Sequence, residues 1–190
     1  MRKQTQMFEP GALVTAEELE RYSSDDRRSE LVDGRIVRMS PVGVEHGRTV
    51  VRLIGLLDSH VRARDLGFVL TEVGFKLASN PDTVRAPDVA FVRRDRIPTP
   101  VPRGFLHGPA DLAIEVLSPD DRVSEITAKV DEYLSAGVAV VLVVDPAHRV
   151  LTSHRRLSPP IVTVSPDDTI DLGDVVPDFI FRIGDVFDVA

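Results

Sequence analysis

The sequence predicts an α/β fold in which a mixed β-sheet is flanked by helices and has antiparallel hairpins at its edge. The run VAVVLVV at 138–144 is uniformly apolar and rich in valine, which is typical of a central strand covered on both faces. LAIEVL at 112–117 precedes it, with a helical pattern between the two runs, so these strands should be parallel. Asp33-Gly34 divides two further strand-like runs, which indicates a hairpin.

The N-terminal half contributes two helices and several strands to this fold. Thr15 and Glu18 form the S/T-x-x-E capping box of a short helix, TAEELERY. A longer helix runs from His46 to about Arg64, because apolar side chains recur there at spacings of three and four. The other elements expected are a hairpin at 30–39, a strand at 68–79 on both sides of Gly74, a loop at 80–87 and a strand at 88–92.

The C-terminal half begins with a Pro-rich loop at 97–109 and the strand at 112–117. The helix that follows ends at Gly137 and has one apolar face. That face comprises Ile126, Val130, Tyr133 and Leu134. After Asp145-Pro146, short strand-like pieces should extend the sheet as edge hairpins without forming a second domain. These pieces are at 150–156, 161–164, 169–172 and 179–187.

The length and composition are those of an ordinary globular protein, with 190 residues, 43% hydrophobic and 28% charged. We expect a flexible N-terminal segment at 1–14 and a single domain at 15–190. The longest apolar run ends at Asp145, well short of the roughly 20 residues of a membrane helix. The polar start MRKQTQ is not followed by the apolar core of a signal peptide. A cytoplasmic protein without membrane contact is therefore expected.

The chain has no cysteine, so a metal would be held by carboxylates, histidines and carbonyls. The oxygen ligands among these favour Mg²⁺ or Mn²⁺. A net charge of −7 argues against a protein that coats nucleic acid, although the carboxylates of a nuclease site are themselves negative. Local basic surface could come from arginines that are otherwise scattered, solvated charges. These are Arg35, Arg38, Arg93, Arg94, Arg96 and Arg103.

Two carboxylates stand at the ends of neighbouring apolar strands, Asp88 in RAPDVAFV and Glu115 in LAIEVL. Their separation of 27 positions (115 − 88) leaves room for the chain to return alongside the first strand. Converging carboxylates repel each other and are driven toward protonation unless a divalent cation lies between them. The pair therefore predicts a metal site. The alternative is that Glu115 forms a structural ion pair and Asp88 merely begins a strand.

Three more side chains are candidates for the same site. Lys129 borders the buried face of its helix, in a row with Glu125 and Tyr133, so its ammonium can reach toward the carboxylates; the alternative is a surface pair with Glu125. His46 could bind the metal, carry a proton or only cap its helix. Glu30 could face the site from the hairpin. No nucleophile elbow, P-loop or dinucleotide fingerprint is present.

The motifs ELVDG, VEHG, RAPDVAFV, LAIEVLSPDDR, E-x-x-x-K-x-x-x-Y, SAGV and VVDP occur in this order over about residues 15–190. In this the chain resembles the Uma family of restriction-endonuclease-like proteins within the PD-(D/E)XK nuclease superfamily. The resemblance implies a restriction-endonuclease-like core and an acidic, Mg²⁺-dependent phosphodiesterase site.

The resemblance also implies roles for individual residues. Asp88 matches the metal-binding Asp, and Glu115 matches the acidic residue of the (D/E)XK element. The lysine of that element would stand at position 117, which is Leu, so the chain is similar to members whose lysine lies on the next helix, here Lys129. Glu30 and His46 match polar positions of the ELVDG and helix-start motifs.

The function expected from this combination is metal-dependent hydrolysis of nucleic acid, with DNA as the substrate. Asp88, Glu115 and His46 would bind Mg²⁺ or Mn²⁺, and Lys129 and Glu30 would complete the catalytic set. A nuclease that cuts both strands often pairs its sites across a twofold axis, so a homodimer is expected. The alternative is a non-catalytic module that binds nucleic acid or a protein, against which the unfavourable carboxylate cluster argues.

Overall fold

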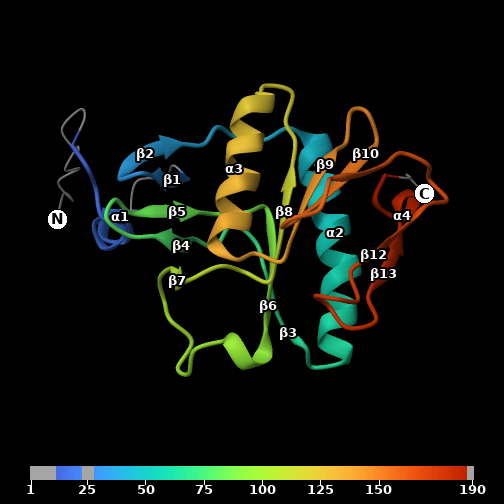
Figure 1. Cartoon of the computed structure of the whole chain (residues 1–190), viewed down its shortest axis with the longest axis horizontal. Helices are drawn as coiled ribbons and strands as arrows, with labels where there is room; N and C mark the ends of the chain where they lie inside the picture. The colour runs from blue at the N-terminus through green and yellow to red at the C-terminus, as the bar shows by residue number, and fades with distance from the viewer. Residues whose placement is uncertain (1–11, 23–27, 188–190) are drawn as a thin grey trace.

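The computed structural model describes residues 12–22 and 28–187 (Figure 1). A six-stranded sheet forms its centre, and only the β8–β9 pair of that sheet is parallel among the described residues. In spatial order its strands are β11 (Ile161–Thr163), β10 (Val150–Arg155), β9 (Val140–Asp145), β8 (Leu112–Val116), β6 (Val89–Arg93) and β3 (Gly67–Leu70). The predicted α/β fold with a mixed sheet, helices on its faces and antiparallel strands at its edge is confirmed.

A five-stranded sheet and a two-stranded sheet complete the β-structure of the described residues. The five strands, in spatial order, are β2 (Arg35–Arg38), β1 (Ser29–Val32), β5 (Thr83–Arg85), β4 (Phe75–Ala78) and β7 (Leu106–His107). The two-stranded sheet pairs β12 (Thr169–Asp171) with β13 (Ile180–Arg182). The helices are α1 (Ala16–Tyr22), α2 (Val44–Ala63), the 3₁₀ turn η1 (Arg94–Arg96), α3 (Val123–Ala136) and α4 (Ile183–Phe187).

Helices α2 and α3 cover opposite faces of the six-stranded sheet. Successive side chains of a strand point to opposite faces, and those of β8 pack against different helices. Ile114 and Val116 of β8 pack in one core with Leu57 of α2. Ala113 packs in a second core with Val130 of α3. Side chains at odd-numbered positions of β8 therefore face α3, where the candidate lysine lies.

Several sequence predictions are confirmed by local geometry. Asp33 and Gly34 both have positive φ, 48° and 74°, as a two-residue hairpin turn of type I′ requires. The Glu18 backbone N–H donates to the Thr15 hydroxyl (3.2 Å), and the Thr15 N–H donates to the Glu18 carboxylate (2.9 Å), which is the predicted capping box. Gly137 ends α3 in the left-handed region, with φ 107°.

The single strand predicted at 68–79 is wrong, because the chain changes sheets within it. β3 pairs with β6 of the six-stranded sheet, whereas β4 pairs with β5 of the other. Glu72 has φ 57°, and Gly74 lies so close to Phe105 that an added Cβ would be 2.3 Å from the ring. The break at 71–74 therefore depends on backbone geometry and a close contact that alternation alone does not reveal.

Two loops and the C-terminal pieces also differ from expectation. The predicted loop at 80–87 contains β5, and the Pro-rich loop contains the short strand β7. β12 and β13 form their own sheet, and 183–187 is helical. Their apolar side chains, such as Phe181, pack in the core that contains Leu53 of α2. These C-terminal pieces therefore pack against α2 and do not extend the six-stranded sheet.

Residues 1–11 of the predicted flexible segment lie outside the described residues, and Val14 at its end is 3% exposed. Within residues 12–22 and 28–187, no helix combines the length and the apolar character needed to cross a membrane.

Candidate active site

Asp88 and Glu115 come together on neighbouring strands. β6 and β8 are antiparallel, with Val89 opposite Ile114, and continuing this register by one residue brings Asp88 opposite Glu115. The Val116 backbone N–H donates to Asp88 Oδ2 over 2.8 Å, which fixes the Asp88 carboxylate against β8. The predicted convergence of the two strand ends is therefore present in the fold.

Glu115 is 5% exposed and has two polar partners from α3. The Tyr133 hydroxyl donates to Glu115 Oε1 (2.7 Å), and Lys129 Nζ donates to Oε2 (3.3 Å). Burial raises the pKa of Glu115 to about 7, and the nearby carboxylates Asp88 and Glu30 act in the same direction, while Lys129 and Tyr133 oppose them. At neutral pH this carboxyl group is therefore poised between its neutral and ionised forms.

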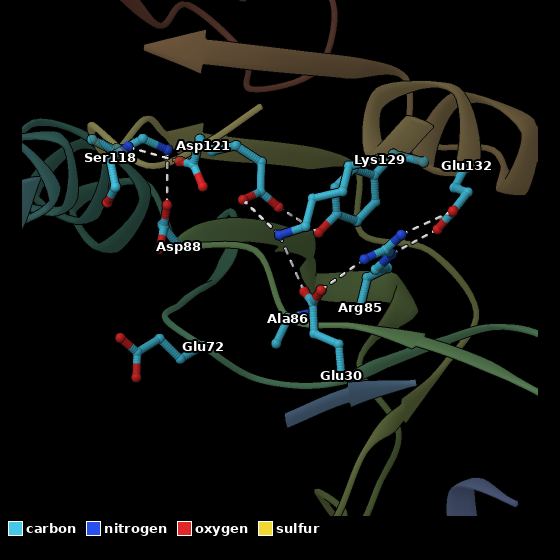
Figure 2. Close-up of polar contacts among 12 residues, drawn as sticks. Glu30, Glu72, Arg85, Ala86, Asp88, Ser118, Asp121, Lys129 and Glu132 are labelled. Carbon is cyan, nitrogen blue, oxygen red and sulfur yellow. Dashed lines mark hydrogen bonds and ion pairs between the residues drawn. The ribbon is translucent and has the colours of Figure 1, made fainter. Parts of the chain in front are cut away.

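Lys129 bridges carboxylates from the two large sheets (Figure 2). Its Nζ lies 3.3 Å from Glu115 Oε2 and 3.3 Å from Glu30 Oε1, and its side chain is only 12% exposed. Burial lowers the pKa of Lys129, but the two carboxylates outweigh burial and leave the pKa raised. The alternative surface pair between Lys129 and Glu125 is not formed, since Glu125 pairs instead with Arg122 at 3.8 Å.

Glu30 is 1% exposed and is held by groups on three sides. Arg85 Nη1 donates to its Oε2 (2.8 Å), and the Ala86 backbone N–H donates to its Oε1 (3.0 Å), which also contacts Lys129. With both oxygens engaged, Glu30 is placed to orient Lys129. Arg85 also binds Glu132 of α3 in a bidentate pair, at 2.6 and 2.9 Å (Figure 2).

His46, at the start of α2, is 6% exposed and contacts Asp88. Its Nε2 lies 3.2 Å from Asp88 Oδ2, and this hydrogen bond raises the pKa of His46 against the opposing effect of burial. Its Nδ1 is buried without a hydrogen-bond partner among the described residues. Asp121, which lies near Asp88 in Figure 2, adds a further negative charge that favours the imidazolium. His46 therefore supports the Asp88 carboxylate.

The donor set fits a magnesium ion that takes only one or two ligands from the protein. Within residues 12–22 and 28–187, no group of three or more His, Asp or Glu side chains is arranged to bind a metal, so His46 does not complete a three-ligand cage with Asp88 and Glu115. Mg²⁺ in nucleotide-processing sites is commonly held by one or two carboxylates, with waters and substrate phosphate as the other ligands. Asp88 Oδ1 accepts no hydrogen bond from the described residues and remains available to a cation.

The six arginines considered as a basic surface divide into two groups. Three of them lie at the end of β6 remote from Asp88 or just beyond it, and each is neutralised by an aspartate. The pairs are Arg93–Asp95, Arg94–Asp65 and Arg96–Asp111. The other three form no ion pair with described residues. Of these, Arg35 and Arg38 are the first and last residues of β2, the strand next to the one that carries Glu30.

Sequence reasoning missed Arg85, Glu132 and the contact made by Tyr133. Arg85 falls in a segment predicted to be a loop, and its partners lie 55 and 47 residues away, so no local pattern marks it. Tyr133 stood in the same helical row as Lys129, and that row is the one signal that pointed to it.

The fold, with two carboxylates and a lysine at the joint of its sheets, is that of the restriction-endonuclease-like α/β proteins. The chain belongs to the Uma2 family, whose model is described as "Putative restriction endonuclease" and matches residues 16–184. It is also similar in structure to a crystal structure described as a putative nuclease belonging to DUF820 from Anabaena variabilis. That comparison has a TM-score of 0.82 and 20% sequence identity over 92% of this chain and 97% of the other. Comparison with curated proteins gives no match.

Proposed function

We propose that this protein is a Mg²⁺- or Mn²⁺-dependent endonuclease that hydrolyses phosphodiester bonds of nucleic acid, with DNA as its substrate. The observation that carries the proposal is the convergence of Asp88, Glu115 and Lys129 from two strands and a helix. Burying neighbouring carboxylates is unfavourable unless cations compensate them, and burial together with Asp88 and Glu30 raises the pKa of Glu115 to about 7 although Lys129 opposes them. The family description and the fold of the Anabaena variabilis structure support the nuclease class.

In this proposal Asp88 and Glu115 would hold the divalent cation, and the chemistry it would supply there is a lowered pKa of a bound water and neutralisation of charge on the phosphate. Lys129 donates hydrogen bonds to the attacking water or to a phosphate oxygen, where negative charge develops in the transition state. Glu30 keeps the Lys129 ammonium in place, and His46 keeps Asp88 in place through its 3.2 Å contact. These two residues therefore act by positioning others.

The test is a digest of a panel containing double-stranded DNA, single-stranded DNA and RNA, with Mg²⁺, Mn²⁺ or EDTA. Asp88→Ala and Glu115→Ala should each abolish metal-dependent cleavage while retaining the far-UV circular dichroism of the folded protein. Glu125→Ala is the matched control, because it removes an exposed carboxylate from the helix that carries Lys129. Equal cleavage by the wild type and both site variants would refute the assignment.

One observation favours a second function, a non-catalytic module that binds nucleic acid or a protein. Both Glu115 oxygens already accept hydrogen bonds from Lys129 and Tyr133, so the cluster is satisfied in part without a cation. Thermal melts with and without millimolar Mg²⁺ or Mn²⁺ separate the two functions. A metal-linked rise in the midpoint that is lost in Glu115→Ala supports the nuclease, whereas unchanged midpoints and no cleavage of the panel support the binding module.

A further inference from the structure

Strand β11 (Ile161–Thr163) is the outermost strand at one end of the six-stranded sheet. It pairs with β10 from Ile161 opposite Ser153 to Thr163 opposite Leu151. No strand of residues 12–22 or 28–187 lies along its other side. Such an edge presents unpaired backbone N–H and C=O groups that can pair with a strand of another chain.

The side chains around this edge are apolar and exposed. The exposed fractions are 59% for Ile161, 61% for Val162 and 59% for Val164, and Leu157 before the strand is 99% exposed. Soluble proteins usually protect an edge strand with charged side chains. In a chain with 28% charged residues, the segment 157–166 (LSPPIVTVSP) contains none.

The edge of the five-stranded sheet provides a contrast within the same molecule. Its outer strand, β2, has an arginine at each end, Arg35 and Arg38, and neither forms an ion pair with described residues. Two copies of β2 brought together would place these unpaired positive charges near one another. β2 is therefore protected against self-association, and β11 lacks this protection.

We propose that β11 pairs in antiparallel fashion with β11 of a second copy of this chain, forming a twofold-symmetric homodimer whose six-stranded sheets are continuous. A second copy is the partner that fits, because a twofold axis sets the strand against itself in reverse, and a strand without charged side chains does so without like-charge repulsion. Pro160 and Pro166 stand on either side of residues 161–165 and lack backbone N–H groups, so they limit the pairing to the residues between them. The inference is independent of the proposed nuclease activity.

The experiment measures the mass of the full-length protein by sedimentation equilibrium at tens of micromolar. The wild type should have twice the monomer mass of 20.9 kDa. Val162→Lys and Val162→Glu should each be monomeric, because like charges meet across the axis, and an equimolar mixture of the two should regain the doubled mass. The matched control is Val101→Lys, since Val101 is exposed to a similar 57% in the Pro-rich loop and its substitution should leave the dimer intact.

Circular dichroism and thermal melting show whether each variant is folded. If Val162→Lys does not fold, Val164→Lys on the same edge makes the same test. A wild type of monomer mass would overturn the proposal. So would folded Val162→Lys or Val164→Lys variants that retain the doubled mass, because the dimer would then form through another surface.

Discussion

Replacing Lys129 with methionine should destabilise the protein by an amount that grows with pH. Lys129 Nζ lies 3.3 Å from both Glu115 and Glu30, and removing one partner of a buried ion pair typically costs about 3–5 kcal/mol. For a chain of this size each kcal/mol lowers the melting temperature by about 2–4 °C, so a loss at the lower end of that range corresponds to about 6–12 °C. Methionine keeps the length of the aliphatic stem, so most of the loss is electrostatic.

The pH dependence comes from Glu115, whose pKa is raised by burial to about 7 and held down by Lys129. Without the ammonium this pKa rises further, so the folded variant binds more protons than the folded wild type above neutral pH. Stability falls with rising pH wherever the native state binds the extra proton. Because one proton per pH unit is worth about 1.4 kcal/mol, the variant should lose about 1–2 kcal/mol more at about pH 8 than at about pH 6.

The assay is urea denaturation of the metal-free protein at the two pH values, followed by circular dichroism. Lys76→Met is the matched control, because the Lys76 side chain is similarly buried, with 13% exposed, and also contacts two carboxylates, Glu17 and Asp82. The pKa values of both acids are lowered, by hydrogen bonds that outweigh burial, so this variant should lose the same stability at both pH values. A Lys129→Met loss that is equal at the two pH values would refute the reasoning about Glu115.

Three further outcomes are expected. In the wild type, Mg²⁺ affinity measured by calorimetry should fall about tenfold per pH unit below about pH 7, because the cation needs ionised Glu115; an affinity independent of pH would contradict this. Tyr133→Phe removes the 2.7 Å hydrogen bond to Glu115 and should weaken Mg²⁺ binding at neutral pH by about tenfold, whereas unchanged affinity would show that the hydroxyl does not tune this carboxylate. Arg85→Met leaves Glu30 without its closest cation and should cost about 3–5 kcal/mol in urea denaturation, compared with less than about 0.5 kcal/mol for the exposed Arg93→Met; equal losses would contradict a structural role for the buried pair.

The parts of the fold that could be predicted are those that a short stretch of sequence determines by itself. The valine-rich β9 and the apolar β8 needed burial on both faces whatever their neighbours, and Asp33-Gly34 dictates a hairpin. β5 (Thr83–Arg85) could not be found in this way, because a three-residue strand with an arginine has too little pattern. Its charge is tolerated only because Glu30 and Glu132 arrive from distant parts of the chain.

The candidate site divides along the same line. The approach of Asp88 and Glu115 followed from two apolar strands and the length between them, and the side of α3 that carries Lys129 followed from helical periodicity. The contacts of each side chain within the site could not be predicted, since the sequence does not reveal that Glu30 binds Arg85 and Lys129. That His46 binds a metal stays a prediction. Its Nε2 lies 3.2 Å from Asp88 Oδ2, and the sequence could not predict this contact because it depends on how α2 packs.

The ion-pair chain from Glu115 through Lys129 and Glu30 to Arg85 has a consequence for how the protein matures. Glu30 and Arg85 belong to the five-stranded sheet and Glu115 to the six-stranded sheet, so neither sheet holds the cluster by itself. A chain emerging from the ribosome contains all of these groups only after Lys129 has been synthesised, and they meet only when α3 docks across both sheets. The complete ion-pair chain is thus absent from any form of the protein that ends before Lys129 or in which α3 has not yet docked across both sheets.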